Sequence, residues 1–312
     1  MDSMNSSHEA NSENFPESIY GAGMSFIVQS VSTTERPVHG LSLLIGLALV
    51  GNIVLQISAI WSVKVYITTP AVFQTRKLYA EFESMAYIDG VFSQDAFDDW
   101  DVLKKRRLCA LPFSQPVFSL MILFIWTMAF VIEVKHTVLF AIWWQQLPKS
   151  EGADVTLEMH EESGTVLVSA ASSRTKASIF GLILIPKMII AVILWWLGAR
   201  WLCATTNLQD LVLNAVALAF IIELDEMTFQ AIVPHRAIRT LSTFRLSVPP
   251  ANGNSSRKVY KWIAQMVGKF AVMILVPLAY MLFFQQVLPG YRFDVHEPCA
   301  GFLEEQMLAP AS

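Results

Sequence analysis

Charged residues are scarce in this sequence: they occupy 15% of its 312 positions, whereas soluble domains carry about 25%. Hydrophobic residues make up 54%, and the mean hydropathy is +0.46. Nine Trp and twenty Phe add aromatic bulk. This composition indicates a multi-pass membrane protein and provides no basis for nucleic-acid binding.

Catalytic and metal-binding signatures are absent from the chain. It contains no Walker loop and no HExxH, GxSxG or GxGD pattern. Cys109, Cys203 and Cys299 are odd in number and unrelated in spacing, which predicts buried or free thiols rather than a disulfide framework or a metal site. We therefore predict no catalytic residue, no cofactor and no metal, and we do not expect an enzyme.

A cleavable signal pattern is also missing. The first 36 residues are rich in Ser, Asn and Glu, and Arg36 is the only basic residue among them. This composition predicts a disordered N-terminal tail, followed by an apolar stretch that acts as an uncleaved anchor.

Four apolar stretches reach the length of about 20 residues that a helix needs to cross a bilayer. The expected architecture is an all-α polytopic bundle of four to five transmembrane helices in a lipid bilayer, and plasma membrane and endomembrane are not distinguished. A homo-oligomer is compatible with this interpretation. The expected segments are a disordered tail (1–40), transmembrane helices (41–63, 116–147 with an amphipathic extension, 177–200 and 263–288), a polar acidic helix (207–229), loops (64–115, 148–176 and 230–262) and a C-terminal tail (289–312).

The acidic helix 207–229 is the fifth candidate span. Only twelve residues separate Asp210 from Glu223, about 18 Å of helix, which is too short to cross alone. Lys and Arg concentrate on the cytoplasmic side of membrane proteins. Loop 64–115 contains seven of them and stretch 230–262 contains six. That bias favours placing both segments in the cytoplasm, with the N-terminus outside and the acidic helix interfacial, re-entrant or packed within the bundle.

Two loops have recognisable patterns. Residues 154–160 and 165–170 alternate in polarity around a turn, which predicts a small β-hairpin within 150–172. An amphipathic helix is predicted near 73–87. The basic run just before the second span is interpreted as an anchor that contacts anionic lipid. It consists of Lys104, Lys105, Arg106 and Arg107.

The acidic helix is predicted to have one polar face. On a continuous helix, Asn207, Asn214 and Asp225 fall within about 20° of one another, and Asp210 and Glu226 flank them. Such a face would line a hydrated path or bind a cation through oxygen atoms. The alternative is a hydrogen-bond network that only locks the helices together.

Lys187 is the expected partner of these acids. If neighbouring spans run antiparallel, its side chain reaches the level of Glu223 or Asp225. Pro186 frees a backbone carbonyl in mid-span and predicts a kink, as Pro277 does in the fourth span. A kinked helix with a basic residue facing an acidic helix occurs at transport sites, but it also describes a static buried ion pair.

The block from Ile183 to Pro234 combines P-K in one span with NLQDLVLNAVAL and a terminal D-E. In this combination it resembles an uncharacterised multi-pass membrane family of single-celled eukaryotes (algae and their relatives). The resemblance covers about a sixth of the chain and implies no activity. It implies that the following residues match the family's pattern: Pro186, Lys187, Asn207, Asp210, Asn214, Asp225 and Glu226.

The leading expectation is a channel- or transporter-like protein that moves an ion or small polar solute past the acidic helix face. The competing expectation is a non-transporting membrane sensor or scaffold, in which the polar residues only hold the bundle together. A water-accessible acidic face would favour the first. A fully paired, dry network around Lys187 would favour the second.

Overall fold

The computed structural model describes residues 12–32, 39–150, 154–160, 164–205, 207–248 and 255–308. The chain divides into two compact units: unit 1 comprises residues 1–58, 132–192 and 221–261, and unit 2 comprises 59–131, 193–220 and 262–312. The described part is mostly helical, with a small mixed sheet. Four helical stretches are long and apolar enough to cross a membrane: Leu43–Ala86, Pro116–Gln146, Ser173–Ala204 and Ala264–Phe284.

These long stretches correspond to the four predicted spans. The first consists of α3 (His39–Ser62), the π-helix η1 (Val63–Thr68) and α4 (Thr69–Ala86), so the predicted amphipathic helix is present as α4. The second is α7 (Pro116–Gln146), which includes the predicted extension. The third joins α8 (Ser173–Ile179), the π-helix η3 (Phe180–Leu184) and α9 (Ile185–Ala204). The fourth joins α13 (Ser255–Ala279) to the π-helix η4 (Tyr280–Phe284).

Wide π-helical turns precede two prolines. Pro186 is the second residue of α9, which follows η3 directly, and Pro70 is the second residue of α4, which follows η1. Proline lacks the N–H that continues the α-helical ladder and clashes with the preceding turn, which a wider turn relieves. Pro277 instead lies inside α13, three residues before η4 begins.

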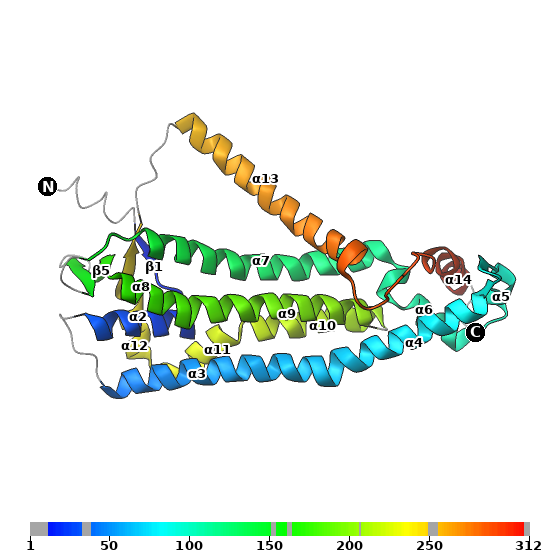
Figure 1. Cartoon of the computed structure of the whole chain (residues 1–312), viewed down its shortest axis with the longest axis horizontal. Coiled ribbons are helices and arrows are strands. Elements are labelled where there is room, and N and C mark those ends of the chain that lie inside the picture. The colour runs from blue at the N-terminus through cyan, green and yellow to red at the C-terminus, as the bar shows by residue number, and fades with distance from the viewer. Residues whose placement is uncertain are drawn as a thin grey trace. The chain divides into compact units, whose positions relative to one another are not determined.

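Unit 1 contains a sheet built from segments far apart in the chain (Figure 1). The predicted hairpin is present as β4 (Val155–His160) and β5 (Thr165–Ala171), but it forms only half of the sheet. The strand order is β1-β6-β5-β4, in which β1 is Ser12–Asn14 and β6 is Phe244–Ser247. Strands β5 and β6 pair in parallel, and the other neighbours pair antiparallel. The all-helical expectation with an isolated hairpin is corrected accordingly.

The disordered tail predicted for residues 1–40 is wrong for residues 12–32, whereas residues 1–11 and 33–38 lie outside the described part. Beyond β1, the helix α2 (Ile19–Val31) is almost wholly buried along its first two turns. Ser18 caps this helix, and its hydroxyl accepts a hydrogen bond from the Gly21 amide. A Cβ on Gly21 would lie 1.9 Å from the Pro16 carbonyl oxygen, so glycine is required at this close approach. Polar residues dominate the tail's composition, but this apolar segment supplies enough buried surface to order it.

The core of unit 1 packs α2 and the sheet against α7 and α8. Phe140 stacks on Trp144 at a ring distance of 6.2 Å, and Phe15 meets Phe140 edge-on at 5.4 Å. Figure 1 shows β1, β5 and the helices α2 and α8 gathered where α7 ends and α8 leads into α9. Two short helices complete this unit: α11 (Leu224–Ile232) and α12 (His235–Thr243).

Unit 2 contains the remaining short elements. They are β2 (Tyr87–Ile88), β3 (Val91–Phe92), α5 (Gln94–Asp98), α6 (Val102–Cys109), η2 (Pro112–Ser114), α10 (Leu208–Ile222) and α14 (His296–Leu308). The last two residues of α10 belong to unit 1. Aromatic rings around the fully buried Phe82 form the centre of the α4–α5 region.

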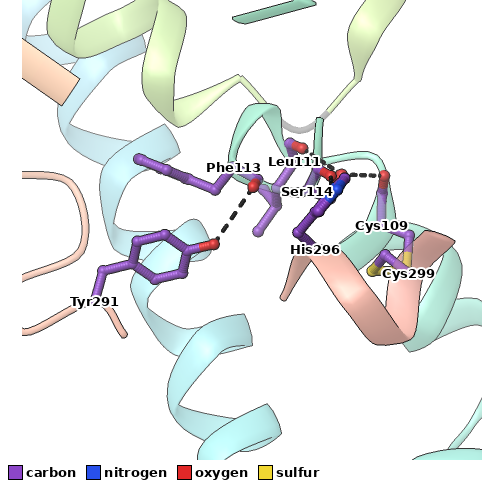
Figure 2. The surroundings of a disulfide bond; sticks show 7 residues. All are labelled: Cys109, Leu111, Phe113, Ser114, Tyr291, His296 and Cys299. Atoms are coloured by element: carbon purple, nitrogen blue, oxygen red, sulfur yellow. Dashed lines mark hydrogen bonds between the residues drawn. A yellow bond between two sulfur atoms is a disulfide. The ribbon is translucent and has the colours of Figure 1, made fainter. Parts of the chain in front are cut away.

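A disulfide joins Cys109 at the end of α6 to Cys299 in α14, with a Cα–Cα distance of 5.2 Å (Figure 2). The prediction that the cysteines are free thiols is therefore wrong for these two, while Cys203 is free and buried. Spacing along the chain carries no information about a pair 190 residues apart. Hydrogen bonds tie the same segments together, because His296 Nδ1 lies 2.7 Å from the Ser114 carbonyl oxygen and Tyr291 donates to the Phe113 carbonyl.

Candidate functional site

The most concentrated buried charge in unit 1 surrounds Lys187. Its ammonium donates to Glu133 Oε1 at 2.6 Å and to Asp225 Oδ2 at 3.1 Å. The three residues come from α7, α9 and α11, and we call them the ion triad. The Lys187–Asp225 pair is one of the two alternatives expected from the depth argument, whereas Glu133 was not anticipated.

The ion triad is shielded to different degrees at its three corners. The side chain of Asp225 is 3% exposed, while those of Lys187 and Glu133 are 15% and 17% exposed. The Tyr20 ring of α2 covers the ammonium, with Nζ 5.1 Å from the ring centroid, which is a cation–π contact. Four helices therefore meet at one lysine.

A chain of amides continues from the ion triad into α3. Tyr20 donates its hydroxyl proton to Gln56 Oε1 at 2.8 Å, and Asn52 Nδ2 donates to the same oxygen at 3.4 Å. Asn52 and Gln56 are buried. Asn52 Oδ1 is also buried and has no hydrogen-bond partner within the described part of the chain. This polar chain links α2 and α3 to the ion triad.

The charges of the ion triad do not balance. One ammonium faces two carboxylates, which is a formal charge of −1 when all three are ionised. A buried ion pair gains stability only when its geometry and hydrogen bonds offset the cost of removing charge from water. Here the short contacts from Lys187 to both carboxylates provide that offset, and loss of the lysine would leave two carboxylates facing each other.

The polar segment is broken where the sequence suggested one continuous helix. Helices α10 and α11 are separated at Glu223, which has φ −81° and ψ 1°. The common face of Asn207, Asn214 and Asp225 was predicted for one continuous helix, and this break separates Asp225 from the two amides. Asp225 contacts Lys187 in unit 1, whereas Asn214 Nδ2 donates to Thr205 Oγ1 at 3.0 Å in unit 2.

The remaining predicted site residues lie apart from the ion triad's contacts. Asn207 Oδ1 accepts from the Gln209 amide at 3.0 Å and so acts at the start of α10. Asp210, Glu223 and Glu226 are exposed. From the predicted set, the structure thus places Lys187 and Asp225 in direct contact.

Sequence reasoning missed Glu133, Tyr20, Asn52 and Gln56 as members of the site. Glu133 is the one acidic residue of α7, and the cost of a carboxylate in an apolar helix was a usable signal. Asn52 and Gln56 interrupt the first apolar stretch in the same way. Tyr20 offered no such signal, because its segment was assigned to a disordered tail.

The basic run is partly engaged in internal contacts. Lys104 pairs with Glu81 at 2.9 Å, and Lys105 is buried and donates to the Asp98 carbonyl at 2.7 Å. Arg106 and Arg107 are exposed.

No group of three His, Cys, Asp or Glu side chains that could hold a metal ion occurs among the described residues. No family model, curated protein or solved structure matched the chain.

Proposed function

We propose that this chain is an integral membrane protein that crosses the bilayer five times. Four crossings are supported by the long apolar stretches. The fifth is supported by connectivity. Cys109 lies between the first and second long helices and Cys299 follows the fourth, so their disulfide places both segments on one side of the bilayer.

The sheet constrains the positions of three other segments relative to the bilayer. Strand β1 precedes the first long helix, β5 lies between the second and third, and β6 precedes the fourth, yet all three belong to one sheet. Helix α2 has 13 residues, about 20 Å, and does not cross by itself. Once the third helix has crossed, its end at Ala204 lies on the side of the disulfide, so the chain must return before β6.

Helices α10 and α11 supply that return crossing. They contain 15 and 9 residues, which together make about 36 Å of helix, and a bilayer core is about 30 Å thick. This arrangement replaces the one favoured by charge bias.

The disulfide also supports an orientation, since disulfides persist in oxidising compartments. Cys109 and Cys299 then face the lumen or cell exterior, and the sheet faces the cytoplasm.

A tag-accessibility experiment tests this topology. One epitope tag is inserted between residues 230 and 262, and another follows residue 312. In cells with an intact outer membrane or sealed microsomes, only the C-terminal tag is expected to lie on the exterior or luminal side. Finding both tags on the same side would reject five crossings.

Among these membrane-spanning helices, the ion triad acts as a structural junction, and the protein is a non-transporting sensor or scaffold. The observation that carries this conclusion is that Lys187 bonds both carboxylates while Asp225 is 3% exposed. The other carboxylates of the acidic segment, Asp210, Glu223 and Glu226, are exposed and are not among the groups that Lys187 bonds. A junction of this kind joins α2, α7, α9 and α11 within unit 1.

Ion transport is the second candidate, and the uneven charge of the ion triad favours it. Two carboxylates share one ammonium, and the buried Asn52 Oδ1 has no hydrogen-bond partner among the described residues, so a proton or small cation would be accommodated electrostatically. Asp225 would then exchange its partner during transport.

Flux through proteoliposomes separates the two candidates. The intact protein is reconstituted, a membrane potential is imposed, and H⁺, Na⁺ and K⁺ movement is recorded against protein-free liposomes. The structural proposal expects no flux above that background, together with a lower melting midpoint for Asp225→Asn. Flux by the intact protein that Asp225→Asn abolishes at equal folded yield would reject the structural proposal in favour of transport.

A further inference from the structure

A polar pocket of about 590 Å³ lies between α4 and α6 in unit 2, apart from the ion triad's contacts. Helix α4 contributes residues spaced by three and four positions, which places them on one helical face, and α6 contributes two residues three positions apart. The lining residues are Gln74, Lys77, Leu78, Glu81, Lys104 and Arg107.

The lining is strongly cationic. Three basic side chains and one acidic side chain carry a formal charge of +2. Glu81 pairs with Lys104, but their side chains are 37% and 47% exposed, and hydrated pairs of this kind are weak enough to open. Within the described residues, neither Lys77 nor Arg107 forms a salt bridge or a side-chain hydrogen bond. Their charge is therefore available to a ligand.

Helix α6 is held firmly in the orientation that presents this face. The Asp101 carboxylate caps its first turn by accepting from the Lys104 amide at 3.0 Å. On the opposite face, Lys105 is buried, with its ammonium 5.7 Å from the Phe97 ring and 5.7 Å from the Phe302 ring. The disulfide at Cys109 secures the last residue of the helix. A pocket whose walls are fixed in this way loses little freedom when it binds a ligand.

We propose that this pocket binds a dianionic, phosphate-bearing group through Lys77, Lys104 and Arg107. The formal charge matches that of a phosphate monoester, and ligand pockets usually measure about 300–1,000 Å³. The Arg107 guanidinium offers paired N–H donors that fit two phosphate oxygens, and the lysines add point charges. The Gln74 amide provides one neutral donor. Either a free phosphate compound or the headgroup of a phosphorylated lipid presents this chemistry.

Two binding arms distinguish those sources. In the first, the full chain in nanodiscs of neutral phosphatidylcholine is titrated with inorganic phosphate and followed by calorimetry. In the second, the chain is placed in nanodiscs that also contain phosphatidic acid, and retained lipid is counted by native mass spectrometry. Binding in the first arm identifies a soluble phosphate compound, binding in the second identifies a headgroup, and either result supports the pocket.

Matched variants connect binding to these residues. Arg107→Ala and Lys77→Ala are each expected to weaken binding by about tenfold or more, because each removes charge-assisted hydrogen bonds. Arg106→Ala removes the same charge from the neighbouring position, which does not line the pocket, and is expected to change affinity by less than about twofold. All three side chains are exposed, so equal melting midpoints should confirm intact folding. Failure to bind in both arms, or an Arg106→Ala loss equal to that of Arg107→Ala, would overturn the proposal.

Discussion

Glu133 and Lys187 lie on different helices, and their charged atoms are only 2.6 Å apart, closer than the 3.1 Å between Lys187 and Asp225. The lysine therefore serves two carboxylates, and the shorter contact is the one that the sequence did not suggest. Because three helices share a single cation, the stability of unit 1 should depend more on the lysine than on either acid.

Removal of the lysine is expected to be severe. Lys187→Met would leave the buried Asp225 and the partly buried Glu133 unpaired, and should reduce the free energy of unfolding by about 3–5 kcal/mol. Thermal melting in detergent and the yield of monodisperse protein measure the effect. Lys135→Met is the matched control, since Lys135 is an exposed lysine of α7. Equal midpoints for both variants would show that the ion triad contributes little.

Neutralising the unanticipated carboxylate should be milder. Glu133→Gln leaves Lys187 paired with Asp225 and balances the formal charge of the site, so we expect a loss of about 1 kcal/mol or less. The same melting assay applies. A melting midpoint of Glu133→Gln as low as that of Lys187→Met would contradict the proposal that Lys187 contributes more to stability than Glu133.

Reduction of the Cys109–Cys299 disulfide should lower the stability of unit 2. Native disulfides typically contribute about 2–4 kcal/mol, and reduction or Cys109→Ser is expected to lower the melting midpoint accordingly. Alkylation of the denatured protein checks the bond directly, with one reactive thiol (Cys203) before reduction and all three cysteines afterwards. Three reactive thiols without reductant would show that the bond does not form.

Alkaline pH should weaken the contacts of Tyr87. Burial and the neighbouring Asp294 raise the pKa of the Tyr87 phenol from 10.0 to about 12, and its hydroxyl donates to Asp294 Oδ2 at 2.6 Å. A raised pKa means that this stabilisation is complete below pH 10 and is lost as the pH rises through 12. Melting midpoints across this window should fall more steeply for the intact protein than for Tyr87→Phe. Parallel curves would argue against this coupling.

The helix contact at Gly198 should tolerate no larger side chain. A Cβ there would lie 2.7 Å from two atoms of the Trp126 indole, which is itself fully buried and donates to the Trp195 carbonyl at 3.1 Å. We expect Gly198→Ala to destabilise the protein by about 1–3 kcal/mol through overpacking. Gly268→Ala, which would contact no heavy atom within 4 Å, is the control and should be neutral or slightly stabilising. Similar melting shifts in the two variants would refute this packing argument.

The sequence pattern predicted those structural features that depend only on residues close together in the chain. Apolar runs of about 20 residues have few alternatives to a long helix, so the four long stretches were predictable, as were hairpin strands β4 and β5. The depth of Lys187 relative to Asp225 followed from helix rise per residue. The break at Glu223 was not predictable from periodicity, because the apolar pattern of this segment is also compatible with one uninterrupted helix.

The sequence by itself therefore determined the number and approximate position of the long apolar helices and the hairpin, and it limited the partner of Lys187 to Glu223 or Asp225, since each depends on spacing along the chain. Tertiary structure decided the rest: that β1 and β6 complete the hairpin's sheet, that Glu133 joins Lys187, and that Cys109 bonds Cys299. These contacts join segments separated by tens to hundreds of residues. No local periodicity specifies such partners, because they are selected by the packing of the whole fold.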